Sequence, residues 1–108
     1  MLFYYRAIFQ AEYDDWKASG RLRSSPTGME GKHFTDTVPL AQAFGRMFRA
    51  VGWERGPFWV IAAKFDDAAA VPLHEEKQDG VGPSYFANEA ALQLVLSVTE
   101  VCQVKEDE

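Results

Sequence analysis

The chain has little of the side-chain chemistry that forms covalent or metal crosslinks. It holds one cysteine, Cys102, in 108 residues, so an intramolecular disulfide is excluded. The place of Cys102 in the apolar run from Val98 to Val104 predicts a small, buried hydrophobic side chain. Two histidines and one cysteine are too few for a structural zinc site, and His74-Glu75-Glu76 has no partner cluster, so we predict no metal site.

Long apolar runs and an excess of basic residues are also missing. No run approaches the length of a membrane span, and residues 1–6 lack the basic and apolar regions of a signal peptide. The 11 Lys and Arg residues are outnumbered by 16 Asp and Glu, and the net charge of -5 gives no general attraction to nucleic-acid phosphates or anionic lipid. We therefore expect a soluble protein with no membrane partner, in the cytoplasm or delivered into the cytoplasm of a target cell.

The residues that are present predict a folded domain. Hydrophobic residues make up 47% of the chain and aromatic residues 14%, a composition that argues against disorder. The length fits one domain, which we place at residues 1–104. The last four residues, Lys-Glu-Asp-Glu at 105–108, predict a solvated acidic tail.

Apolar periodicity divides this domain into strands and helices. Aromatic and β-branched runs predict four strands: Leu2–Ile8, Lys32–Thr35, Phe58–Phe65 and Ser97–Val104. Helical spacing and capping residues predict helices from Phe9 to Gly20, from Thr37 to Gly52 and from Asn88 to Leu94. Phe58–Phe65 is nearly all apolar, which predicts a central strand, while Glu75–Ser84 is predicted to be a loop. The order predicts an α+β fold: one mixed, twisted sheet with two main helices against it.

Two residues on the predicted strands are candidates for a binding role. Arg6 follows Tyr4-Tyr5, where a guanidinium is costly to bury unless paired, and its planar fork suits a phosphate or a ribose. His33 shares a strand face with Thr35, beside a helix N-terminus that attracts anions. A surface ion pair for Arg6 and a structural role for His33 are the alternatives.

The stretch Gly31-Lys32-His33-Phe34-Thr35-Asp36, followed by Ala41–Phe44, resembles a block of the ADP-ribosyltransferase fold. In the poly-ADP-ribose-polymerase-like branch this block reads Gly-x-Tyr-Phe-Ala-Asp, then Ser-Ala-x-Tyr. Tyr5-Arg6-Ala7 is similar to the first-strand Tyr-His-Gly of that branch, or to the arginine of the toxin-like branch. The arrangement also resembles small ADP-ribosyltransferase domains at the ends of bacterial polymorphic toxins.

The resemblance implies a site for NAD, which would be the substrate. It implies catalytic roles for Arg6, His33 and Glu100. It implies contacts to NAD by Tyr5, Arg6, His33, Phe34 and Thr35. A glutamate near the last strands would stabilise the positive charge that develops on the ribose as nicotinamide leaves. No Glu-x-Glu pair occurs in the region where the family carries it, so Glu89 and Glu75 stand beside Glu100 as alternatives.

The function expected from the resemblance is transfer of ADP-ribose to a protein or nucleic-acid acceptor, by a bacterial toxin or effector. A catalytically silent module of the same fold is the first alternative. A small ribonuclease-type toxin could use His33 with Glu100 or Arg6 for acid–base work on RNA. An acidic immunity-type protein that binds a basic cognate toxin would fit the net charge. The sequence leaves open whether the chain is an enzyme.

Overall fold

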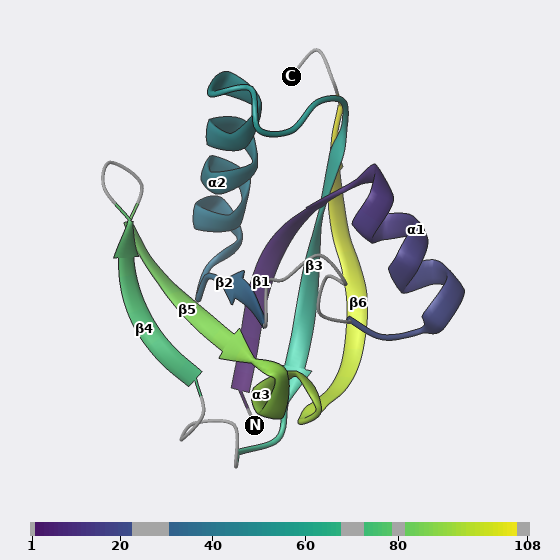
Figure 1. Ribbon diagram of the computed structural model, residues 1–108, viewed down its shortest axis with the longest axis vertical. Coiled ribbons are helices and arrows are strands. Elements are labelled where there is room, and N and C mark those ends of the chain that lie inside the picture. The colour runs from purple at the N-terminus through teal and green to yellow at the C-terminus, as the bar shows by residue number, and fades with distance from the viewer. Residues whose placement is uncertain (1, 23–30, 68–72, 79–81, 106–108) are drawn as a thin grey trace.

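The computed structural model describes residues 2–22, 31–67, 73–78 and 82–105, which form an α+β fold (Figure 1). The elements in order are β1 (Leu2–Phe9), α1 (Gln10–Ser19), β2 (Gly31–Phe34), α2 (Val38–Ala50), β3 (Phe58–Phe65), β4 (Leu73–Gln78), β5 (Gly82–Asn88), α3 (Glu89–Leu92) and β6 (Val95–Val104). The expected fold class is confirmed. The end of the predicted acidic tail, 106–108, lies outside the described residues.

The first sheet has the order β1-β3-β6, and both strand pairs are antiparallel. The apolar run of β3 therefore occupies the centre, as predicted. Its alternate residues enter two hydrophobic clusters, because successive side chains of a strand point to opposite faces. Phe58 and Val60 pack on the face that α2 covers, whereas Ile61 and Phe65 pack on the face shared with α1 and the second sheet.

The second sheet has the order β2-β5-β4, and its pairs are also antiparallel. Its β4–β5 hairpin corrects the predicted loop at Glu75–Ser84. The sequence Leu-His-Glu-Glu-Lys-Gln of β4 is polar and has no strand-like alternation, and β5 opens with Gly-Pro. Backbone pairing holds β4 at the edge of the sheet, where charged residues are common.

Among the described residues, one pair forms backbone hydrogen bonds between the two sheets. Tyr5 N–H donates to the Thr35 carbonyl at 2.7 Å, and Thr35 N–H donates back to the Tyr5 carbonyl at 2.7 Å. Directly afterwards the chain turns away, because the Thr35 hydroxyl donates to the Thr37 carbonyl at 2.8 Å. The prediction of one mixed sheet is therefore wrong. β2 leaves β1 after a single bridge, and two antiparallel sheets result.

Helix ends follow the local signals in the sequence. Gly20 ends α1 in the left-handed region at φ 76°, where glycine has no Cβ penalty. The Thr37 hydroxyl accepts from the Leu40 N–H at the start of α2. The Asn88 side chain accepts from the Ala91 N–H at the start of α3. These three predicted caps are confirmed.

Close packing of α2 against the first sheet depends on Gly45. A Cβ built at Gly45 would overlap the ring of Phe58, which is fully buried. We expect Gly45→Ala to lower the free energy of unfolding by about 2 kcal/mol, the usual cost of forcing an extra group into a packed core. Urea unfolding measures this, with the solvent-exposed helix position Arg46→Ala as the control. Equal stability of the two variants would contradict the packing.

Candidate functional site

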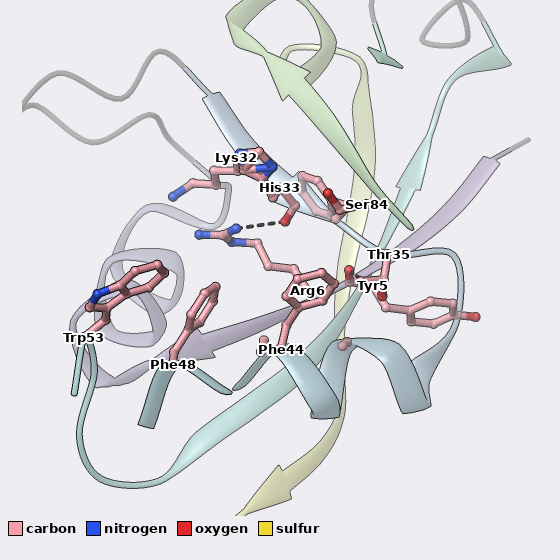
Figure 2. Close-up of a pocket in the computed structure, with 12 residues that line it drawn as sticks. Tyr5, Arg6, Lys32, His33, Thr35, Phe44, Phe48, Trp53 and Ser84 are labelled. Atoms are coloured by element: carbon pink, nitrogen blue, oxygen red, sulfur yellow. Dashed lines mark hydrogen bonds between the residues drawn. The ribbon is translucent and has the colours of Figure 1, made fainter. Parts of the chain in front are cut away.

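A cavity of about 350 Å³ lies between β1, β2 and α2. Strand residues 5–7 and 32–35 form one side of it, and α2 with the loop that follows forms the other (Figure 2). Cavities that hold small ligands have volumes of roughly 300–1,000 Å³. The volume therefore suits a small ligand.

Two cations lie on the strand side of the cavity. Arg6 donates from Nε and Nη2 to the two carboxylate oxygens of Glu12, at 2.7 and 2.8 Å, and from Nη1 to the His33 carbonyl at 2.8 Å. Lys32 Nζ lies 3.2 Å from the same Glu12 carboxylate. α1 and β2 thus hold the guanidinium in a partly buried ion pair, whereas the alternative that the sequence left open for Arg6 was a surface ion pair.

The ionisation of these groups follows from burial and mutual attraction. Burial by itself would raise the pKa of Glu12, but Arg6 and Lys32 hold that pKa below its ordinary value. Burial and the nearby charge of Arg6 lower the pKa of Lys32. Burial by itself would lower the pKa of Arg6, but the contact with Glu12 outweighs burial and raises that pKa above its ordinary value. Glu12 is therefore ionised at neutral pH and in close contact with both cations.

Aromatic rings face the two cations across the cavity. The ring centroids of Phe44 and Phe48 are 6.3 Å apart, and those of Phe48 and Trp53 are 5.8 Å apart. Trp53 is 71% exposed, so its ring stands at the mouth of the cavity. Figure 2 shows the nitrogen ends of Arg6 and Lys32 pointing to the same side as this ring. The site joins a cationic side to a wall of three rings, which we call the aromatic wall.

The residues expected to contact NAD lie together around this cavity. Tyr5, Arg6, His33, Phe34 and Thr35 all contribute to its lining. The ring centroids of His33 and Phe86 are 5.0 Å apart, and the backbone carbonyl of His33 accepts a hydrogen bond from Arg6. Thr35 is buried, and its hydroxyl bonds to backbone carbonyls. Phe34 is fully packed in the core, so it supports the cavity from behind.

Glu100 does not line this cavity. It lies on β6 in a row with Arg6, because both residues pair with Ile61 of the central strand. Helix α1 separates their side chains: Glu12 binds Arg6, whereas the Tyr13 hydroxyl donates to Glu100 at 2.9 Å. This hydrogen bond raises the pKa of Tyr13. The predicted catalytic group is therefore engaged at the far edge of the sheet.

The two alternative glutamates lie on other elements. Glu75 is on β4 and Glu89 begins α3, and the side chains of both lie outside the described part of the structure. Among the described residues, no three His, Cys, Asp or Glu side chains lie close enough together to hold a metal ion. No helix in that part of the chain is long and apolar enough to cross a bilayer.

Comparison with known proteins adds no relative. No protein-family model, no curated protein and no solved structure matches the chain. The ADP-ribosyltransferase resemblance therefore stays a prediction from short motifs, and nothing assigns this fold to that family.

Several residues of the site carry little or no signal in the sequence. Glu12 does carry a signal. It follows Arg6 by six residues and lies in the first turn of α1, just after β1 ends, a placement that predicts contact between the two side chains. Phe44 and Phe48 have the helical spacing of core residues, and Phe44 is indeed buried. Trp53 follows the helix in a loop, where no periodicity predicts its position. Ser84 contributes from β5, inside the segment predicted to be a loop.

Proposed function

We propose that the chain binds a small ligand that combines an aromatic ring with an acidic group, and that one nucleotide half of NAD is such a ligand. The observation that supports this is the pairing of two cations with an aromatic wall across one cavity. A guanidinium fixed by Glu12 is preorganised for a carboxylate or phosphate oxygen. A flat ring gains about 0.5–1.5 kcal/mol from aromatic contacts beyond its buried area.

The proposal covers binding and not transfer of ADP-ribose. Transfer needs a carboxylate beside the ribose carbon that becomes positively charged. Glu100 faces Tyr13, and Glu12 is already ion-paired with both cations of the site. The arrangement favours a catalytically silent binding module over a transferase.

Tryptophan fluorescence gives a direct test, because Trp16 and Trp59 are buried and Trp53 is exposed. We expect NAD to change the emission of Trp53, and titration calorimetry to give a dissociation constant in the micromolar range. Trp53→Phe should remove most of the signal while calorimetry still detects binding. Lys32→Gln should weaken binding by about tenfold or more, the value of a charge-assisted hydrogen bond.

The matched control is Lys64→Gln, which removes the same charge from β3 away from the cavity. It should leave the affinity for NAD unchanged. Nicotinamide alone, which carries the ring without a phosphate, should bind much more weakly than NAD. Absence of heat and of any emission change at millimolar NAD would overturn the proposal.

A further inference from the structure

Glu12 holds both cations of the site but does not belong to the lining of the cavity. Its two oxygens accept hydrogen bonds from Nε and Nη2 of Arg6, and one of these oxygens also contacts Nζ of Lys32. The side chains of Arg6 and Glu12 are 20% and 21% exposed, and that of Lys32 is 9% exposed. The carboxylate therefore acts on the two cations from the side of α1, and a ligand would approach them from the cavity.

Both cations keep donors for such a ligand. A guanidinium has five N–H donors and an ammonium has three. Within the described residues, Arg6 donates three times, twice to Glu12 and once to the His33 carbonyl. Lys32 has one contact there, with Glu12. Counted over the described residues, each cation retains two N–H groups, so an acidic group can bind while Glu12 stays in place.

The charge of this cluster is small. Arg6 and Lys32 contribute two positive charges and Glu12 one negative charge, so one positive charge remains. The negative charge of Asp15 attracts Lys32 and that of Glu54 attracts Arg6, both more weakly than Glu12 does. A ligand group with one negative charge is balanced by the cluster. A second negative charge would have no partner in a site where partial burial strengthens electrostatic interactions.

We infer that Glu12 sets the charge selectivity of the cavity, so that it prefers a singly charged acidic group to a doubly charged one. The preferred class includes carboxylates and phosphodiesters, such as each phosphate of NAD. The disfavoured class is the phosphomonoester, whose second pKa near 6 makes it largely dianionic at pH 7.5. This inference rests on the proposed binding function and names its specificity-determining residue.

A matched pair of probes tests this inference. Nicotinamide mononucleotide carries a phosphomonoester, and its phosphate methyl ester has the same ring and sugar with one charge fewer. At pH 7.5 the wild-type protein should bind the methyl ester several-fold more tightly. Glu12→Gln raises the cluster charge to two, so its preference should reverse in favour of the monoester, with a change in the affinity ratio of about tenfold or more.

A merely structural role for Glu12 predicts a different result. Glu12→Gln would then weaken both probes equally, and an unchanged ratio would overturn the inference while the proposed binding function stands. Failure of both probes to bind the wild-type protein would overturn both. If Glu12→Gln does not fold, Lys32→Gln lowers the cluster charge to zero and keeps the Arg6–Glu12 pair. It should disfavour the dianion further, and an unchanged ratio there would again contradict the inference.

Discussion

Replacing Phe34 with alanine is expected to lower the free energy of unfolding by about 4 kcal/mol, the range measured for truncating a buried phenylalanine. Phe34 is 1% exposed and packs edge-on against Phe65, with ring centroids 5.3 Å apart. It lies on β2, next to the single Tyr5–Thr35 bridge between the sheets. The ring therefore fills space between the two sheets, and its removal leaves a cavity in the core.

Urea unfolding followed by circular dichroism measures this loss. Phe3→Ala is the matched control, since Phe3 is 53% exposed on β1 and the same atoms are removed. We expect it to cost less than about 1 kcal/mol, as is usual for exposed positions. A similar loss in both variants would show that the junction between the sheets does not depend on Phe34. Since small domains are stable by about 5–15 kcal/mol, this loss would be a large fraction of the total stability.

The parts of the fold that could be predicted are those with a strong local pattern. The apolar run of β3 predicted a central strand, and Gly20, Thr37 and Asn88 predicted helix ends. The parts that were wrong depend on pairing between distant segments. β4 is polar, so only its register against β5 makes it a strand. β1 and β2 share only an isolated bridge in the described structure, so they belong to two sheets, and no periodicity in the sequence predicts where such pairing stops.

The same distinction applies to the site. Arg6 and the β2 residues were named for their chemistry and for the family resemblance of their two strands, and the Tyr5–Thr35 bridge brings these strands together. Glu100 was named by its place on the last strand, but α1 lies between it and Arg6. The aromatic wall needs α2 and the loop at Trp53 to reach the cavity from a distant part of the sequence.

Replacing Arg6 with methionine is expected to have the second large effect, a loss of about 3 kcal/mol at neutral pH. The variant removes the two hydrogen bonds to Glu12 and the one to the His33 carbonyl. It leaves a largely buried carboxylate with Lys32 as its nearest cation. Breaking a fully buried ion pair costs about 3–5 kcal/mol, and partial exposure places this one at the lower end.

The pH dependence of this loss separates the ion pair from simple packing. Arg6 and Lys32 hold the pKa of Glu12 in the folded protein below the unfolded value of about 4.3. The ion pair therefore stabilises the fold fully above that unfolded value, and this stabilisation disappears as the pH falls through the folded-state pKa. The destabilisation by Arg6→Met should accordingly be largest near pH 7 and should shrink below about pH 4.

A variant pair decides whether Glu12 is the group responsible. In a Glu12→Gln background, Arg6→Met should have an effect that no longer changes between pH 7 and pH 3, because no carboxylate is left to titrate at that position. Arg46→Met, at an exposed position of α2, should have a small effect at every pH. If Arg6→Met cost the same at pH 7 and pH 3 in the wild-type background, the packing of the arginine stem would account for its role. The cluster would then offer a ligand no preorganised charge, since the attraction that fixes the guanidinium is the same one that lowers the pKa of Glu12.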